Sequence, residues 1–377
     1  MTIDPVELAR DLIRRASVTP ADGGAMDVVE TALSGLGFTC RRMKFGQIEN
    51  LYARRGSARP NLCFAGHTDV VPAGDAAAWS MAPFAAEVTD GVLFGRGAVD
   101  MKSAIAAFIG AIPYQVTGSI SLLITGDEEG VAEDGTRRVV EALAAEGEVI
   151  DHCVVGEPTS SAVLGDMIKI GRRGSLNAEI QVEGVQGHVA YPHKAANPVP
   201  VLVRLLARLS ARELDQGYSG FQPSNLEITT VDVGNATTNL IPAKASARVN
   251  IRFNPSHSGA ALADWIQDEA RIANQGFEGR VIVTPKISGE AFLTLPGDFT
   301  AVVAGAVSAV TGLTPELSTT GGTSDARFIR ALCPVVELGL VGATMHAVDE
   351  RVVVADIMAL SEIYRRLITD YFAAFSS

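Results

Sequence analysis

Two kinds of hydrophobic pattern alternate along the first part of the chain. Helices are predicted at about residues 5–16, 25–36, 101–112 and 135–145; in the first, Val6, Leu8, Leu12 and Ile13 fall on one side. Short apolar runs at about 50–54, 61–65, 120–125 and 152–155 are typical of buried strands. Strands that alternate with helices in this way predict an α/β domain built on a largely parallel sheet.

The pattern changes after the segment Gly171-Arg-Arg-Gly174. Apolar and polar residues alternate over 176–182, 226–233 and 245–253, as they do in half-exposed strands, and a fourth strand is predicted at 280–286. Helices are predicted at about 198–211 and 259–274. The resulting order β-α-β-β-α-β is the ferredoxin-like plan. It predicts an antiparallel sheet with helices on one face and edges available for pairing with another subunit.

The α/β pattern resumes at about residue 288. It continues with a helix at 298–310, a strand at 333–340 and a final helix at about 354–372. We therefore predict a discontinuous, mainly parallel-sheet α/β domain at 1–174 and 288–377, interrupted by a smaller ferredoxin-like α+β domain at 175–287. The first domain would carry catalysis, and the inserted one would serve dimerisation and act as a lid.

Composition and charge narrow the class of protein. The 377 residues are 47% hydrophobic and 20% charged, which describes a soluble globular protein. The formal net charge of −12 argues against a nucleic-acid partner, which would need a basic face. The N-terminus carries charges where a secretory signal needs an apolar core, and no apolar run is long enough to span a membrane, so we expect a cytoplasmic location. The scattered cysteines, Cys40, Cys63, Cys153 and Cys333, are expected to be reduced.

Potential metal ligands follow the predicted strands of the α/β domain. Ligands in open parallel sheets gather beyond the carboxyl ends of the strands, so these side chains are expected to converge at one edge. They are His67 with Asp69, the run Asp127-Glu-Glu129, Glu157 and His346, together with Asp100 at a helix start.

Each of these residues also has an ordinary structural interpretation. Successive carboxylates could form a solvated acidic turn, Asp100 could cap a helix, and Glu157 could be a turn residue. His346 alone could be a hydrogen-bonded histidine. Convergence is what favours a metal site. Residues two apart in an extended chain face the same way, so His67 could bind a metal while Asp69 accepts a hydrogen bond from its other ring nitrogen.

Histidine and carboxylate ligands without cysteine suit catalytic zinc. The candidate ligands exceed what one zinc with an open position needs. They match two zincs that share a bridging carboxylate and lie about 3.5–4 Å apart. Of the neighbours Glu128 and Glu129, one would bind metal and the other would lie beside the bridging water as general base, a role worth roughly 10²- to 10⁴-fold in rate.

Several segments resemble motifs of the co-catalytic zinc aminoacylase and carboxypeptidase superfamily, and within it those of the succinyl-diaminopimelate desuccinylases. The likeness extends over about residues 4–372. The segments are Ala65-Gly-His-Thr-Asp-Val-Val-Pro72, Gly95-Arg-Gly-Ala-Val-Asp-Met-Lys102, Asp127-Glu-Glu129, Gly156-Glu-Pro-Thr-Ser160, Gly171-Arg-Arg-Gly174, Gly187-His-Val-Ala-Tyr-Pro-His193 and Thr320-Gly-Gly-Thr-Ser-Asp325.

The resemblance implies a role for each member of the cluster. It implies two Zn²⁺ per subunit, with Co²⁺ able to substitute. It also implies that Asp69 orients His67 and that Glu128 is the proton acceptor. The implied ligands are His67, Asp100 and Glu157 for one zinc, and Asp100, Glu129 and His346 for the other.

The resemblance further implies a homodimer formed through the inserted domain. In it, His188 would reach the partner's active site and hold the tetrahedral oxyanion, a contact worth about 3 kcal/mol. From the residues alone, His193 is just as plausible. The implied substrate-binding residues are Arg172, Arg173, Tyr191, Asn239, Arg252, Gly322 and Thr323. The arginines could grip carboxylates bidentately, or they could be ordinary surface residues.

The implied reaction is hydrolysis of N-succinyl-L,L-2,6-diaminopimelate to succinate and L,L-2,6-diaminopimelate, in lysine and diaminopimelate biosynthesis. A hydroxide bridging the zincs would attack the amide carbonyl, with Glu128 as general base. Gly342 stands where the family commonly has Asn, which removes one possible contact with the substrate. Acetylornithine deacetylase or another N-acyl-amino-acid amidohydrolase is the alternative within the superfamily. A non-catalytic, metal-binding dimeric scaffold is a remote one.

Overall fold

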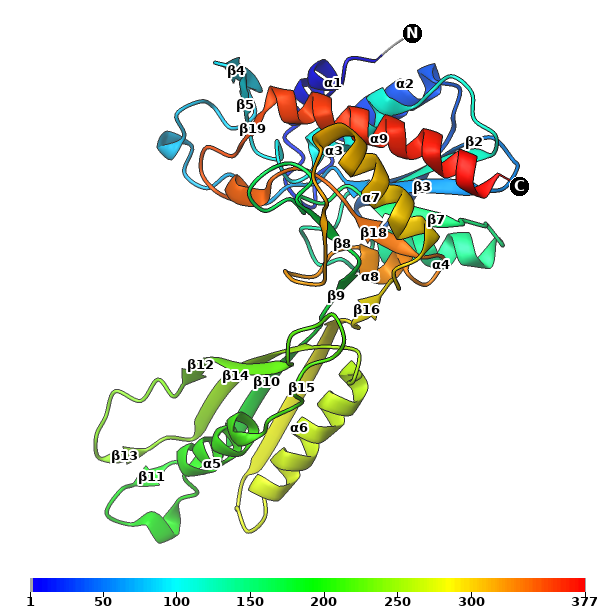
Figure 1. Ribbon diagram of the computed structural model, residues 1–377. Coiled ribbons are helices and arrows are strands. Elements are labelled where there is room, and N and C mark those ends of the chain that lie inside the picture. The colour runs from blue at the N-terminus through cyan, green and yellow to red at the C-terminus, as the bar shows by residue number, and fades with distance from the viewer. Residues whose placement is uncertain (1–2, 377) are drawn as a thin grey trace. The chain divides into compact units, whose positions relative to one another are not determined.

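The computed structural model describes residues 3–376, and the chain divides into two compact units (Figure 1). Unit 1 comprises Met1–Ile170, Thr294–Ser318 and Ser324–Ser377, and unit 2 comprises Gly171–Leu293 and Thr319–Thr323. Unit 2 therefore begins before the predicted residue 175 and ends after the predicted residue 287. The short segment Thr319–Thr323 was not anticipated as part of it, because it lies far along the chain from the insertion.

A central eight-stranded sheet forms the core of unit 1, in the order β1–β2–β6–β3–β7–β18–β8–β17. The neighbours β6, β3, β7 and β18 run parallel, which confirms the predicted mainly parallel sheet. Every residue of β3 and β6 is buried, as expected for strands covered on both faces. The strands are β1 (Thr39–Phe45), β2 (Ile48–Arg55), β3 (Asn61–His67), β6 (Ser119–Thr125), β7 (His152–Val155), β8 (Met167–Lys169), β17 (Glu316–Ser318) and β18 (Val335–Glu337).

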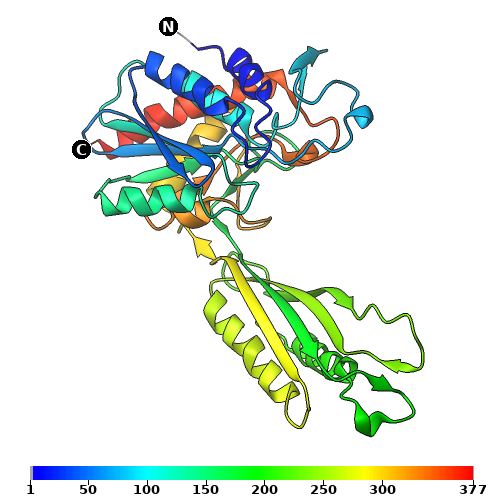
Figure 2. The same cartoon turned by 180° about the vertical axis from the view of Figure 1, so that it is seen from behind.

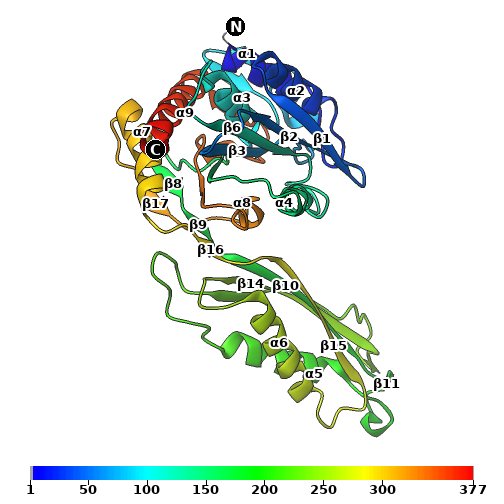
Figure 3. The ribbon, with the colours of Figure 1, turned by 90° about the vertical axis from the view of Figure 1, so that its right-hand side faces the viewer.

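Helices cover both faces of this sheet (Figure 3). One layer contains α1 (Pro5–Ile13), α2 (Ala25–Gly35), α3 (Lys102–Ala111), α7 (Asp298–Thr311) and α9 (Val354–Phe375), and the other contains α4 (Thr136–Ala145) and α8 (Ala326–Ile329). Helix α1 begins where it does because Asp4 accepts hydrogen bonds from the N–H groups of Val6 and Glu7. Its buried residues, which include Leu8 and Leu12, face the core.

A small antiparallel sheet in unit 1 links two loops that matter for the site. It has the order β19 (Arg351–Val353), β5 (Val92–Phe94), β4 (Glu87–Thr89). Strand β5 precedes the loop that carries Asp100, and β19 directly follows the loop that carries His346. This pairing brings together two segments that are about 250 residues apart in the sequence.

Unit 2 is an antiparallel sheet covered on one face by two helices (Figures 2 and 3). The sheet order is β12 (Asn225–Asp232), β14 (Lys244–Phe253), β10 (Gly174–Glu183), β15 (Arg280–Gly289), and the helices are α5 (Pro198–Ala211) and α6 (Gly259–Ala273). The chain order is the predicted β-α-β-β-α-β. Two short pairs complete the unit: β9 (Gly171–Arg172) with β16 (Phe292–Leu293), and β11 (Gly187–His188) with β13 (Leu240–Ile241).

Some elements differ from the pattern-based prediction. Strand β1 was missed because its sequence, Thr-Cys-Arg-Arg-Met-Lys-Phe, is rich in basic residues; it is an edge strand that pairs only with β2. The strand predicted at 333–340 is limited to β18, and α1 ends at Ile13 rather than near residue 16. The four cysteines are free thiols, and three of them are buried. Among residues 3–376, no helix is both long enough and apolar enough to cross a bilayer.

Candidate metal centre and active site

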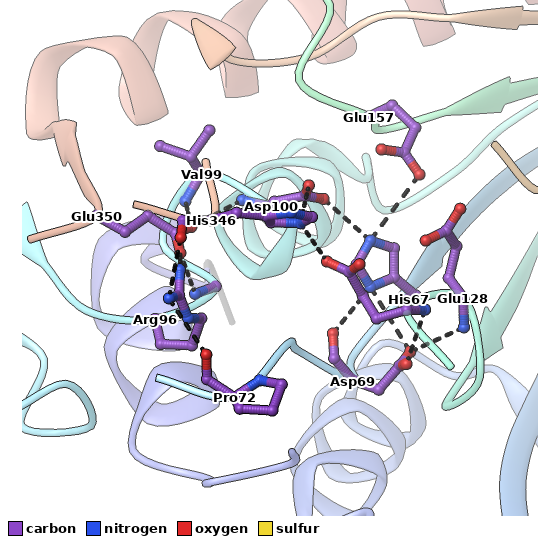
Figure 4. A network of polar contacts seen from close by, with 12 residues as sticks. His67, Asp69, Pro72, Arg96, Val99, Asp100, Glu128, Glu157, His346 and Glu350 are labelled. Carbon is purple, nitrogen blue, oxygen red and sulfur yellow. Dashed lines mark hydrogen bonds and ion pairs between the residues drawn. The ribbon is translucent and has the colours of Figure 1, made fainter. Parts of the chain in front are cut away.

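Three parallel strands deliver polar side chains to one edge of the sheet (Figure 4). His67 is the last residue of β3, Glu157 follows the end of β7, and Glu128 follows the end of β6. The strands are neighbours in the order β6–β3–β7, so their carboxyl ends lie side by side. A Cβ atom at Gly339, just after β18, would collide with the backbone of Glu157. The close approach of these strand ends therefore requires glycine at that position.

The first group of candidate ligands is centred on His67. Its Nε2 lies 3.0 Å from Asp100 Oδ1 and 3.9 Å from Glu157 Oε1. One ligand atom from each of the three residues lies within 4.8 Å of the others. All three residues are buried. This is the set that the resemblance assigned to one metal.

The second group is centred on His346, on the loop before β19. Its Nε2 lies 2.7 Å from Glu129 Oε1 and 3.4 Å from Asp100 Oδ2. Asp100 thus presents one carboxylate oxygen to each histidine, as a bridging ligand would. Glu128 and Glu129 also form a compact group with His67, so Glu128 lies beside both sets without belonging to either of them.

Asp69 contacts the cluster differently from the sequence expectation. The nearer partner of His67 Nδ1 is the backbone carbonyl of Asp69, at 2.9 Å, whereas the carboxylate oxygen lies at 3.6 Å. The carboxylate instead accepts hydrogen bonds from the backbone N–H groups of Glu128 (3.2 Å) and Glu129 (3.0 Å). Asp69 therefore fixes His67 through its backbone and the acidic run through its side chain.

The surroundings of Glu157 and Glu128 disfavour the charged form of their carboxyl groups. Glu157 Oε1 is buried and has no hydrogen-bond partner. Burial, followed by the charges of Asp100 and Glu128, raises the pKa of Glu157 well above its usual range. Burial, with the charge of Asp325, also raises the pKa of Glu128 to about 8. Groups of this kind are stable as anions only beside positive charge, so this site fits a bound cation.

The two histidines compensate part of this negative charge. Burial alone would lower the pKa of His67, but its hydrogen bond to Asp100 and the nearby carboxylates raise it well above the usual value. Hydrogen bonds to Asp100 and Glu129 raise the pKa of His346 to about 10. Burial would raise the pKa of Asp100, but the two histidines lower it. Imidazole and carboxylate donors without cysteine are the ligands that catalytic zinc takes, so the residues present fit that ion.

The predicted residues of unit 2 form two separate groups. At one end of the sheet, Arg173 Nη1 donates to Asn225 Oδ1 (3.0 Å), and Arg252 is the register partner of Asn225 across β12 and β14. Arg172 Nη1 donates to the carbonyl of Thr320 (3.1 Å), in the same short segment as Gly322 and Thr323.

The second group lies beyond the other end of β14, at the antiparallel pair of short strands β11 and β13, called the β11–β13 pair below. His188 and Tyr191 are exposed, with ring centroids 5.7 Å apart, and the carbonyl of exposed Asn239 accepts from Val189 N–H (3.2 Å). Strand β14 runs from the β11–β13 pair to Arg252. Lys244, its first residue, is eight residue steps from Arg252, which at about 3.4 Å each is a separation of about 27 Å. One small substrate therefore cannot touch both groups of the same subunit.

Sequence reasoning missed two charged residues next to the cluster. Arg96 and Glu350 are almost fully buried and form an ion pair of 2.7 Å between Nη1 and Oε2. Arg96 lies inside the quoted glycine-rich motif, and Glu350 follows His346 by four residues. A charge of either sign close to a candidate ligand was the available signal, but it does not reveal which residues pair.

The family model for peptidase family M20/M25/M40 matches residues 63–370. The chain is 71% identical over 378 residues to the succinyl-diaminopimelate desuccinylase of Caulobacter vibrioides, covering 100% of this chain and 98% of that protein.

Solved structures show the same fold. The M20 family metallo-carboxypeptidase Sso-CP2 from Sulfolobus solfataricus aligns with a TM-score of 0.81 at 16% identity, covering 98% of this chain and 99% of that one. The YXEP protein of Bacillus subtilis, described as a dinuclear metal-binding peptidase from the M20 family, aligns with a TM-score of 0.72 at 14% identity, covering 98% of both chains.

Proposed function

Because this chain belongs to peptidase family M20/M25/M40, we propose that it is a metal-dependent amidohydrolase that cleaves N-succinyl-L,L-2,6-diaminopimelate to succinate and L,L-2,6-diaminopimelate. The 71% sequence identity over 378 residues to a succinyl-diaminopimelate desuccinylase supports this substrate. The reaction would supply diaminopimelate and lysine biosynthesis, and we propose a cytoplasmic location for it.

One observation carries the metal centre: two compact ligand groups share Asp100. We infer two Zn²⁺ per subunit, with Co²⁺ as an alternative ion. One would be held by His67, Asp100 and Glu157, and the other by Asp100, Glu129 and His346. When bound, the pair would supply Lewis-acid chemistry, which polarises the amide carbonyl and lowers the pKa of water.

We assign the proton transfers of the reaction to Glu128. It lies beside both ligand groups, and its backbone N–H donates to the Asp69 carboxylate. Its carboxylate takes a proton from the attacking water and passes it to the departing amine nitrogen. Burial raises its pKa to about 8, and the positive charge of bound cations would favour the anionic form that a base needs.

The separation of the two groups in unit 2 supports a dimer. If the arginine group and His188 both contact substrate, they belong to different subunits, because about 27 Å of β14 lies between them in one chain. The edge strand β12 is largely exposed, and its outer residues include Ile228 and Val231. We infer that unit 2 forms the homodimer and that His188 of one subunit donates to the oxyanion in the other.

The arginines of unit 2 are suited to the substrate's carboxylates. Arg172, Arg173 and Arg252 present planar guanidinium groups that bind carboxylates bidentately. Tyr191 and Asn239 would add polar contacts from the β11–β13 pair of the other subunit, and Gly322 and Thr323 from the 319–323 segment. Gly342 offers no side chain toward the acyl group, and a Cβ atom there would lie 3.2 Å from the carbonyl oxygen of Pro158.

A substrate panel tests the proposal. Purified protein loaded with Zn²⁺ is assayed on succinyl-diaminopimelate and on acetylornithine, with the metal content measured in the same preparation. We expect a kcat/KM for the succinyl substrate that exceeds the other by at least about tenfold, since one lost ionic contact is worth that much. Equal or reversed preference would favour the deacetylase alternative. Bound metal without turnover of either compound would favour the scaffold.

A further inference from the structure

We propose that Arg96 and Glu350 are positioning residues: together they form a buried bridge that fixes the distance between Asp100 and His346, and so sets how tightly the chain holds its metal ions. The inference rests on the proposed metal centre. It concerns residues whose contacts to Asp100 and His346 are made to the backbone. The bridge is labelled in Figure 4.

Glu350 anchors the loop that carries Asp100. Its Oε1 accepts from the backbone N–H groups of Val99 (2.8 Å) and Asp100 (3.1 Å). Its Oε2 accepts from the N–H of Gly97 (3.0 Å) and from Arg96 Nη1 (2.7 Å). One carboxylate thus satisfies four donors, three of them on the backbone leading into Asp100.

Arg96 anchors the loop that carries His346. Its Nη2 donates to the carbonyls of His346 (3.3 Å) and Pro72 (3.4 Å), and its Nη1 donates to the carbonyl of Ala347 (3.3 Å). The guanidinium also stacks over the ring of Trp79 at 5.2 Å. The pair therefore ties three loops together: residues 72–79, the approach to Asp100, and the loop after His346.

The His346 loop needs this support because its backbone is strained. His346 has φ of 61° and Asp349 has φ of 57°, in the left-handed region that residues with a side chain disfavour. Ser80 holds Asp349 through its N–H and its hydroxyl, both at 2.7 Å. Released from these contacts, the loop would relax and carry the imidazole away from Asp100 and Glu129.

The burial of the bridge also argues for a positioning role. Arg96 is 3% exposed and Glu350 is 0% exposed. A buried ion pair is a poor source of stability, because desolvation offsets the attraction and an apolar pair of similar volume often does better. Six hydrogen bonds to backbone groups, three from each residue of the pair, give it geometric control instead, as outer partners of metal ligands do.

The test measures metal binding directly. Glu350→Gln keeps the shape but turns a donor amide toward two N–H groups, so two of the four hydrogen bonds are lost. We expect Zn²⁺ affinity, measured by competition with a chromogenic chelator, to fall about 10- to 100-fold. The visible spectrum of the Co²⁺-loaded protein should change as well, which a loss of stability alone would not cause.

Arg96→Lys separates the two metal sites and serves if Glu350→Gln does not fold. Lysine keeps the charge but cannot reach Glu350 and the carbonyls of His346 and Pro72 together. We expect the first equivalent of metal to bind as in the wild type and the second, held by His346, to weaken. The matched control is Glu148→Gln, which removes the negative charge from a carboxylate that accepts from Arg54 and Tyr52 elsewhere in unit 1 and should leave metal affinity unchanged.

The outcomes distinguish this bridge from the function on which it rests. If folded Glu350→Gln and Arg96→Lys proteins bind both equivalents with wild-type affinity and an unchanged Co²⁺ spectrum, the bridge is refuted while the metal centre stands. Equal weakening in the Glu148→Gln control would also refute it. If the wild-type protein binds no divalent metal at all, the proposed metal centre fails and the bridge fails with it.

Discussion

The ligand cluster of unit 1 and the β11–β13 pair of unit 2 both carry predicted functional residues, but their surroundings are opposite. In the cluster, Asp100 and Glu157 are buried, crowded by like charges and in part without hydrogen-bond partners. In the β11–β13 pair, His188 is exposed, and its Nδ1 accepts from the N–H of Ala190 at 3.0 Å. One region shows an energetic cost that a ligand would remove, and the other shows none.

This contrast teaches where a single chain reveals its chemistry. A buried, uncompensated carboxylate persists only if something outweighs its desolvation, so the cluster itself points to a cation. An exposed histidine incurs no such cost, and its role depends on what a second subunit places against it. Unit 1 can therefore be interpreted from its own geometry, whereas the role of the β11–β13 pair depends on the proposed dimer.

The largest expected effect lies in the cluster, at Glu128. Glu128→Gln removes the base and keeps the shape, so we expect kcat to fall by about 10²- to 10⁴-fold while metal content stays unchanged. Its neighbour provides the matched control: Glu129→Gln should lose metal, because Glu129 lies 2.7 Å from His346 in the second ligand group. Steady-state kinetics and metal analysis of both variants check this. Surviving turnover in Glu128→Gln would rule out the general-base role.

The next largest effect is expected at the β11–β13 pair, where His188→Asn is compared with His193→Asn as control. Loss of an oxyanion donor costs about 10²- to 10³-fold in kcat, which we expect for His188 only. Mixing inactive Glu128→Gln and His188→Asn subunits should restore about a quarter of wild-type activity, because half of the dimers are mixed and each mixed dimer contains one intact site. A mixture that stays inactive would mean that His188 does not act across the dimer.

A smaller effect is expected in the arginine group. Arg252→Lys keeps the charge but loses the bidentate geometry, so KM should rise about tenfold with kcat less affected. Arg248→Lys is the control: it lies four residues earlier on β14, so on the same face of the strand, and it is exposed. Initial-rate measurements on succinyl-diaminopimelate distinguish the two. Equal KM values would remove Arg252 from the substrate site.

The smallest effect concerns stability, in a loop cluster of unit 2. Burial would raise the pKa of Asp215, but hydrogen bonds from Ser224, Gly217 and Asn254 lower it to about 2. The folded pKa lies below the unfolded value near 4, so this stabilisation is full above pH 4 and is lost as pH falls through 2. Asp215→Asn should cost about 2 kcal/mol at pH 7.

Urea unfolding of the Asp215→Asn protein across pH measures this effect. The difference from wild type should shrink below pH 4, where the Asp215 carboxylate of the unfolded chain becomes protonated, and should vanish as the pH falls through the folded pKa of about 2. Asp264→Asn, at an exposed position on α6, is the control and should remain close to wild type at every pH. A difference that does not change with pH would show that the ionised form of Asp215 contributes nothing.

Much of the fold followed from the hydrophobic pattern. Both domain types could be predicted from continuous apolar runs, which became β3 and β6, and from alternating runs, which became β10 and β14. The spacing of apolar residues along a strand depends on whether one or both of its faces are buried. The basic edge strand β1 and the short strands β4, β5, β8, β17 and β19 were not predictable, since their residues carry no distinct period. The 319–323 segment joins unit 2 only through contacts distant in sequence.

By itself, the sequence determined which ligand chemistry stands at the ends of the parallel strands, because each strand ends at a known residue and the sheet aligns those ends. Only the tertiary structure decided which atoms meet: that Asp69 holds His67 through its carbonyl, that Asp100 faces both histidines, and that Arg96 pairs with a residue 254 positions away. The physical reason is range. Helix and strand periods arise from neighbours within a few residues, whereas a hydrogen bond between distant loops depends on how the whole unit packs.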